Sequence, residues 1–546
     1  MTKTYSANSL SASEKRAALA KQLTQGDVGN GEVIEKGEEV VILANGETVN
    51  ASGHQQELER NFSLLNMCAV AIVIGNCWSI SGATLVLSAY NGGAPGIIYE
   101  FMAAGLLYLC VTASLAELAS AIPSSAGVYH WASITPGRGA VGRAIGFFAG
   151  HWNALAYTLG TASLVAVTSE GIVQMWAVTH ADSGYVVERW HVFVVFLLIT
   201  WCNITVLLFA NRALPMLNNI FMALGYGGWL VLIVALAVLP SRGEAADGTP
   251  GKGYASSSFV WTEWQNNTGY ASNGLVFVLG MLNGAFNIGV PDCSTHMSEE
   301  VPRPARNIPI AMGIQMAGNF VSTIAYLVVL LYGISDWDAV LSSSAAFPLT
   351  EIYSQASGGS AAGALGLTVV TMLPLLGSAL GSTLTASRAF WTLARDGATP
   401  FSAVFGRVHP RRHTPVAAIL FVGVFDTLMG FVYLGSDTAF QAMVGSFVVL
   451  VALSYLAALI PFLVRRKAGV KRGPFALPGA LGVVITSISC AFLSVWVVFY
   501  CFPYAVPVEA ATMNYSSVIA GGLTFLVGGW YLWVRKTYEG PPILEY

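Results

Sequence analysis

Long apolar stretches determine what this chain can fold into. Twelve of them occur between residues 66 and 534, most close to the ~20 residues that a helix needs to cross a bilayer. Charged residues make up 10% of the chain, against roughly 25% in soluble domains. We therefore predict an all-α integral membrane protein with 12 transmembrane helices. The predicted spans are 66–89, 97–121, 145–168, 191–210, 216–239, 273–291, 309–333, 362–387, 414–434, 439–463, 479–502 and 516–534.

The basic residues orient these spans. Of the 26 Lys and Arg residues, all but Arg189, Arg242 and Lys252 lie in segments on one side of the spans. Cytoplasmic loops carry the excess of basic residues, so both termini are predicted to be cytoplasmic. The predicted organisation is a disordered cytosolic tail (1–65), a ten-helix transport core (66–463), two peripheral transmembrane helices (464–534) and a second cytosolic tail (535–546).

Several functional classes are not expected. The seven cysteines form no CxxC pair and mostly lie in or beside apolar spans, which is typical of small buried hydrophobes rather than disulfides or a zinc site. No basic face suggests nucleic acid, and no catalytic constellation suggests an enzyme, a metal or a cofactor. Membrane lipid and a small-molecule substrate are the expected partners. Among the N-x-S/T sequons, Asn266 and Asn514 fall in loops placed outside and are glycosylation candidates.

Two spans carry small and amide residues where a continuous helix is expected. Span 66–89 contains 79–83 (Ser-Ile-Ser-Gly-Ala) and span 273–291 contains 283–289 (Asn-Gly-Ala-Phe-Asn-Ile-Gly). Glycine permits unusual dihedral angles, and backbone that leaves the helix at membrane depth must line a cavity or be buried. These are the first and sixth spans, and five crossings reverse orientation. The pattern therefore predicts a 5+5 inverted repeat with broken helices 1 and 6.

The two breaks predict a substrate site. The half-helix after the first break would present free N–H groups and a positive dipole end to a carboxylate. The second break would present carbonyls to an ammonium group. Close helix packing is the alternative for Ser81 and Gly82. The predicted residues are Ser79, Ile80, Ser81, Gly82, Ala83, Asn283, Gly284, Phe286 and Asn287.

Aromatic residues would decide between a zwitterion and a quaternary ammonium. A trimethylammonium group cannot donate hydrogen bonds and needs π faces around it. Trp78 and Phe286 adjoin the breaks, while Trp152 and Tyr157 share one side of the third span with Asn153. Ordinary packing or lipid contact remains the alternative for each of these aromatic residues.

Acidic residues within spans are costly to bury and are functional candidates by default. Glu100 and Asp426 lie inside spans, and Glu170 follows the third span, where it could attract a cationic substrate or simply face water. A structural pair is preferred for Asp426. His296 and Glu299 follow the second break and are interpreted as parts of a cytosolic gate rather than as metal ligands.

Four motifs occur in an informative order: 114–123 (SLAELASAIP) with 127–131 (GVYHW), 292–302 (DCSTHMSEEVP), 394–402 (ARDGATPFS) and 472–475 (RGPF). They resemble the amino acid–polyamine–organocation permease superfamily over roughly residues 60–535. The run 304–309 (PARNIP), with 292–297, looks most like the fungal amino acid/choline transporter branch, which includes choline and 4-aminobutyrate permeases. The resemblance implies a leucine-transporter-type fold, a plasma-membrane location and proton-driven uptake, and it makes Glu117 a gate residue.

The expected function is secondary active import of a small nitrogenous solute, with a proton as the coupling ion. The substrate stays open among choline-like amines, 4-aminobutyrate, polyamines and neutral amino acids. A non-transporting nutrient sensor is the alternative from another class. Some proton-coupled relatives carry a lysine in the fifth helix, but span 216–239 has none, so the proton acceptor is unidentified. Ser378, Ser382 and Thr383 leave sodium chemically open. The oligomeric state is not predicted.

Overall fold

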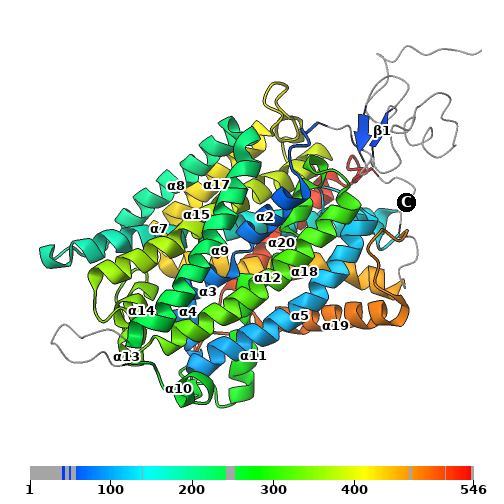
Figure 1. Cartoon of the computed structure of the whole chain (residues 1–546). Helices are drawn as coiled ribbons and strands as arrows, with labels where there is room; N and C mark the ends of the chain where they lie inside the picture. The colour runs from blue at the N-terminus through cyan, green and yellow to red at the C-terminus, as the bar shows by residue number, and fades with distance from the viewer. Residues whose placement is uncertain are drawn as a thin grey trace, which may run out of the picture.

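The computed structural model describes residues 40–42, 48–50, 54, 57–137, 139–241, 253–465, 470–510 and 512–542. Most of these residues lie in helices that run side by side as one bundle (Figure 1). Helices suit a lipid environment because each satisfies its own backbone hydrogen bonds where no water is present. The prediction of an all-α membrane protein is confirmed.

The long helices agree with the predicted spans to within a few residues at most ends, apart from longer ends on the third and eighth spans. They are α5 (Gly93–Ala121), α7 (Ala140–Thr179), α8 (Arg189–Phe209), α9 (Leu214–Val238), α11 (Asn273–Ile288), α12 (Pro304–Tyr332), α15 (Ala361–Arg395), α17 (Val416–Gly435), α18 (Asp437–Val464), α19 (Gly479–Phe499) and α20 (Ser516–Val534). The first span is divided into α2 (Leu64–Ile74), α3 (Cys77–Ala83) and α4 (Leu85–Ala89).

Short elements connect the long ones. The short helices are α6 (Val128–Ile134), α10 (Ser257–Trp261), α13 (Trp337–Leu341), α14 (Leu349–Ala356) and α16 (Ser402–Phe405), with 3₁₀ turns η1 (Ala181–Ser183), η2 (Asn211–Ala213), η3 (Leu239–Ser241) and η4 (Cys293–Glu300). The described residues also form two antiparallel strand pairs: β1 (Val40–Ile42) with β2 (Thr48–Asn50), and β3 (Asn91–Gly92) with β4 (Gln265–Asn266).

Within the described residues, 11 helical segments are long and apolar enough to cross a membrane. The remaining predicted span, 145–168, lies within α7, which has 40 residues but is not among the 11. Many glycine, serine and threonine residues of α7 are buried against other helices, so its sequence need not be as apolar as a lipid-facing helix. The count of twelve spans therefore stays a prediction.

Two groups of helices pack around the first span. In one group α5 contacts α11 and α12, and in the other α7 contacts α8, α15 and α18. The α2 segment lies between them and contacts α9, α12 and α15, in the middle of the bundle in Figure 1. The last two helices pack on the rest of the bundle: α19 contacts α5 and α18, and α20 contacts α18 and α7.

The first break lies earlier than predicted. The α2 helix ends at Ile74 with Gly75 as its C-cap, and Asn76 has φ −52° and ψ 67°, outside the helical region. A Cβ at Gly75 would lie 2.6 Å from Nε2 of Gln315, so glycine makes room for an amide of α12 at this point. The predicted break residues 79–83 instead form the body of α3.

The second break lies later than predicted. Residues 283–288 are helical, and α11 ends at Ile288 with Gly289 as its C-cap. The chain then passes through Val290 and Pro291 before η4. Proline lacks an N–H and disfavours helical geometry in the residue before it, which explains why the break falls here rather than at the glycine-rich run.

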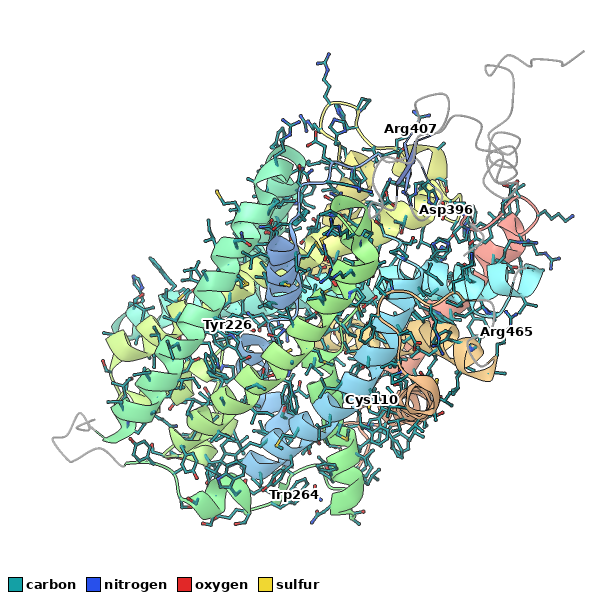
Figure 2. All side chains as sticks on the ribbon, turned by 45° about the vertical axis from the view of Figure 1, so that its right-hand side comes forward. Cys110, Tyr226, Trp264, Asp396, Arg407 and Arg465 are labelled. Atoms are coloured by element: carbon teal, nitrogen blue, oxygen red, sulfur yellow. The ribbon has the colours of Figure 1, made fainter. Side chains whose placement is uncertain are left out.

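The two ends of the bundle differ in charge. Figure 2 shows Arg407, Asp396 and Arg465 at one end and Trp264 at the other; we call these the basic end and the opposite end. Residues 57–62 reach the basic end and pack there: Leu58 and Phe62 are buried, and the Phe62 N–H donates to the Glu300 carbonyl. The predicted disordered tail therefore does not extend through these residues; its first 39 lie outside the described part of the chain.

Candidate functional site

The two helix breaks meet in the centre of the bundle. The Cys77 thiol lies 3.0 Å from the Asn287 carbonyl, to which it can donate. Gln315 of α12 adjoins Gly75 and donates from Nε2 to the Val290 carbonyl at 3.0 Å. Carbonyl groups released by the second break are thus held by side chains next to the first break. This satisfies backbone groups that have no helical partner.

A cavity of about 30 Å³ lies beside the breaks. It is bounded by α2, α3, α7, α11, α15 and α18, and the side chains that characterise it are Ile80, Tyr157, Phe286, Asn287, Ser382 and Phe447. Phe286 and Phe447 meet edge to face with ring centroids 5.6 Å apart. The volume is room for about two waters. In this conformation the cavity is therefore closed to a larger solute, which would require these rings to move.

Asp292 is the most strongly hydrogen-bonded charged group near this cavity. It is 0% exposed and accepts from the Tyr157 hydroxyl at 2.6 Å, from Asn153 Nδ2 at 3.0 Å and from the Tyr455 hydroxyl. Donors of this kind stabilise a negative carboxylate. Because Tyr157 also lines the cavity, the carboxylate stands directly behind one cavity wall.

His296 lies 3.6 Å from Asp292, measured from Nε2 to Oδ2. Its Nδ1 is 3.1 Å from the Ser125 carbonyl, which requires the proton to be on Nδ1. The imidazole therefore joins η4 to the 123–127 segment that leads into α6. Its Nε2 faces the carboxylate and would become a second donor if protonated.

Ion pairs close the basic end below this network. Glu299 accepts from Arg395 Nη1 at 3.0 Å, and Glu300 accepts from Arg388 Nε at 2.8 Å. These pairs tie η4 to the end of α15, and all four side chains are buried or nearly so. Separating η4 from α15 would leave buried charges unpaired, which is costly.

His54 adds the amino-terminal segment to the basic end. Its Nε2 lies 2.7 Å from Asp396 Oδ1, just after α15. Burial lowers the pKa of His54 below 6.5, and the neighbouring Arg395 lowers it further, against the opposing effect of Asp396. Nearby, burial lowers the pKa of His130 to about 4. The His130 Nε2 lies 3.1 Å from the Pro542 carbonyl, so the carboxyl-terminal segment also docks at this end.

Only some of the predicted site residues meet at the cavity. Ile80, Tyr157, Phe286 and Asn287 line it together, although they come from three different helices. Asn153 holds Asp292 instead. Trp152 points away and donates to Thr524 on α20.

The remaining residues of the first break pack elsewhere. Trp78 meets Tyr326 edge to face at 5.2 Å, and Gly82 faces the same tyrosine ring. The Asn76 amide donates to the Ser79 hydroxyl at 2.5 Å. Ala83 is half-buried at the end of α3. These contacts support the packing interpretation for Gly82.

Residues of the second break also divide. Asn283 donates to the Ser88 hydroxyl, and Gly284 packs against the backbone of α5. Ser81 lies with Ser88 in a separate small pocket beside Glu100. The amide of Asn287 is shared between that pocket and the cavity.

The predicted gate and glycosylation residues are scattered. Glu117 is buried near the basic end of α5, whereas Glu170 on α7 accepts from the Tyr433 hydroxyl at 3.1 Å. Asn266 is half-buried and donates to the Tyr270 carbonyl. Asn514 is fully buried and donates to the Tyr500 carbonyl, so a glycan there would require that contact to break.

Asp292 lies within one of the four sequence motifs, but no role for it was predicted. Its position directly after Pro291, where a span ends, is the signal that could have identified it. Tyr455 and Phe447 were also missed. They lie in the apolar α18, where nothing in the sequence separates them from ordinary packing aromatics.

The chain matches the amino acid permease family model over residues 63–525. The chain belongs to the amino acid permease family. A choline transporter of Saccharomyces cerevisiae is 30% identical over 87% of this chain and 81% of its own. An amino-acid permease of Arabidopsis thaliana is 28% identical over 90% and 94%, and a transmembrane transporter of Metarhizium robertsii is 28% identical over 88% and 93%. As a permease the chain is an integral membrane transporter, and its relatives are transporters rather than enzymes.

Proposed function

We propose that this permease imports a choline-like quaternary amine into the cell by proton-driven secondary active transport. The observation that carries the proposal is a cavity with three aromatic side chains, Tyr157, Phe286 and Phe447, backed by the buried carboxylate of Asp292. Aromatic faces attract a quaternary ammonium, and the carboxylate balances its charge. No Lys, Arg or His lines this cavity among the described residues. The name of the yeast relative agrees with this substrate class.

An amino acid is the second candidate. The amide and carbonyl groups of the two breaks adjoin the cavity and suit a zwitterion, and the Arabidopsis relative is named an amino-acid permease. 4-Aminobutyrate and polyamines belong to this alternative. A nutrient sensor with the same site would bind a substrate without moving it.

We also propose the finer topology. The α7 helix crosses the membrane as the twelfth span, helices α2–α3 and α11–η4 are the broken first members of a 5+5 inverted repeat, and the basic end faces the cytosol. The location is the plasma membrane. The two groups of helices that flank the breaks then supply the moving parts of alternating access.

In this orientation the basic end is the cytosolic gate. Its Glu299–Arg395 pair and the His296 contact with Ser125 hold η4 in place, and Glu117 lies near the same end. Opening toward the cytosol would require η4 to leave α15. Glu170 lies near the outer end of α7, where its charge attracts cations to the vestibule.

Radiolabelled choline uptake tests the proposal. The protein is expressed in yeast lacking its own choline and 4-aminobutyrate permeases, with surface expression quantified and an empty vector as control. Saturable uptake that is faster at external pH of about 5 than about 7.5 is expected. Absence of choline uptake by surface-expressed protein, with uptake of an amino acid or 4-aminobutyrate, would transfer the assignment to the second candidate. Binding without any uptake would favour the sensor.

A further inference from the structure

Glu100 occupies an unusual position on α5. The residue is 1% exposed, and neither carboxyl oxygen has a hydrogen-bond partner among the described residues. A Cβ at Gly280 would lie 2.1 Å from its Cδ and Oε2. The carboxyl group therefore rests against the backbone of α11 at a point where only glycine leaves room.

The carboxyl group faces a small pocket of about 10 Å³, roughly the space of one water. Polar groups in this pocket come from Ser81, Ser88 and Asn287. The Ser81 hydroxyl and the Asn287 Oδ1 have no hydrogen-bond partner in the described part of the chain. A protonated carboxyl carries one donor, which either of these oxygens could accept after a small movement.

Among the side chains that the structure describes, none with a charge other than Glu100 itself lines the pocket. Helices α3, α4, α10, α11 and α19 contain no Asp, Glu, Lys, Arg or His. The charged residues of α12 and α18 lie at their first turns, Arg306 and Asp437, and Glu263 beside β4 is exposed. The titratable neighbours that remain are uncharged, with Tyr326 of α12 behind Gly82 and Tyr108 further along α5.

An ionised carboxylate here would be buried without a counter-charge or a donor. Such burial is costly, so the closed conformation favours the protonated acid. The same group becomes ionisable once water reaches it. Its charge state is therefore linked to whether this pocket is open or closed.

Asn287 connects the pocket to the substrate cavity. The residue borders both spaces, its Oδ1 has no hydrogen-bond partner among the described residues, and its backbone carbonyl receives the Cys77 thiol from the first break. A substrate that turns the Asn287 amide toward itself would change what the Glu100 carboxyl can contact. This gives the two spaces a physical link through one side chain.

We propose that Glu100 carries the coupling proton, so that proton binding in this pocket accompanies substrate binding in the cavity. The inference rests on the proposed proton-driven uptake. While the protein is open to the outside, external hydronium gives a proton to one oxygen of the Glu100 carboxylate, which leaves water and the neutral acid. The closed protein holds the neutral acid. After the conformational change the acid returns the proton to cytosolic water, which restores the carboxylate and hydronium.

The test compares Glu100→Gln with Asp426→Asn in cells and in reconstituted vesicles. Asp426 is a matched control because it is also buried in a helix with both oxygens unpartnered among the described residues, but it lies on α17, away from the cavity. Two readouts are needed: accumulation of choline driven by a proton gradient, and exchange of labelled for unlabelled choline, which needs no gradient.

For Glu100→Gln we expect accumulation at acidic external pH to fall to the level of the wild type near neutral pH, while exchange stays within about two-fold of wild type. Asp426→Asn should retain gradient-driven accumulation. Accumulation by Glu100→Gln that still follows the proton gradient would overturn the proposal. So would loss of both readouts in surface-expressed protein, because Glu100 would then serve binding or structure rather than coupling.

The wild type separates this inference from the proposed function. Wild-type uptake that does not change with pH but depends on sodium would show that the proton is not the coupling ion. This result would reject the role of Glu100 but would not contradict choline as the substrate. No wild-type uptake of choline would reject the substrate alone, and the Glu100→Gln comparison would then decide on coupling with the amino acid or 4-aminobutyrate that the cells take up. If Glu100→Gln fails to reach the membrane, Glu100→Asp carries the test: the midpoint of uptake against pH should shift, and an unchanged midpoint would refute the proposal.

Discussion

Asp292, between the two halves of the second broken helix, and Glu100, which packs against its first half, are buried carboxyl groups whose surroundings differ in kind. Asp292 accepts hydrogen bonds from two tyrosines and an asparagine, with an imidazole beside it. Glu100 has no partner in the described part of the chain and rests on Gly280. The first environment stabilises a permanent negative charge and the second penalises it. A carrier that moves a cation together with a proton needs one group of each kind.

The largest expected effect comes from Asp292→Asn. The substitution keeps the size of the side chain but removes the charge that balances the substrate and weakens the bonds to Tyr157 and Tyr455. Choline uptake should fall on the order of 100-fold, the equivalent of about 3 kcal/mol. Uptake kinetics normalised to surface expression measure this, with Asp426→Asn as control. Near-normal choline uptake would show that Asp292 does not balance the charge of the substrate, and the contrast with Glu100 would then have no functional meaning.

A smaller loss of uptake is expected when a substitution at Gly280 displaces the Glu100 carboxyl group while Glu100 itself is kept. In Gly280→Ala the new methyl group would overlap the carboxyl of Glu100, and such overpacking typically costs about 1–3 kcal/mol. Gradient-driven uptake should fall roughly 10-fold, with exchange less affected. Gly313→Ala on α12 is the matched control because no atom lies within 4 Å of its added Cβ. Equal behaviour of the two alanine variants in uptake and thermal stability would show that the Glu100 pocket tolerates change.

The sequence predicted the helices better than the breaks. Apolar length determines where lipid-crossing helices lie, so most of the predicted spans agree with the structure. Break positions depend on single residues. Gly75 leaves room for Gln315 of a distant helix, and Pro291 follows directly after the end of α11. The glycine-rich run 283–289 stays helical up to Ile288 because it packs on α5. Composition could not reveal these tertiary contacts.

The site was predicted in part for the same reason. Ile80, Tyr157, Phe286 and Asn287 meet at the cavity, as residues near breaks should. The role of Asp292 depends on tyrosines from α7 and α18 that are 135 and 163 residues away in the chain. A single sequence does not show which residues from distant helices will meet.

Phe286→Leu should sharpen the contrast between a cation site and a zwitterion site. Leucine keeps the apolar contact with Phe447 but removes a π face, and a cation–π contact contributes about 0.5–2 kcal/mol. The apparent affinity for choline in uptake should fall several-fold more than the apparent affinity for a neutral amino acid that competes with it. Phe286→Tyr retains the face and serves as control. Equal losses for both solutes in competition assays would argue against aromatic recognition of the ammonium.

The smallest effect concerns a third carboxylate, Asp396, which lies beyond the spans and is paired with His54. Since the pKa of His54 is lowered below 6.5 when the segment is docked, docking favours the neutral imidazole. The stabilisation of the docked segment is complete above about pH 6.5 and is lost as the pH falls toward the lowered pKa of His54. Acidification from about pH 7.5 to about 6 should therefore loosen residues 57–62.

Hydrogen exchange of purified protein at these two pH values measures the docking. Residues 57–62 are expected to exchange faster at the lower pH, after correction for the intrinsic rate. In His54→Ala they should exchange faster at both pH values, because the free energy of docking is lower by roughly the 1 kcal/mol of one hydrogen bond. Greater protection on acidification would mean that the charged imidazole pairs with Asp396 strongly enough to outweigh its burial and the nearby Arg395. The basic end would then resemble the Asp292 network, in which a carboxylate is stabilised by its donors, rather than the Glu100 pocket.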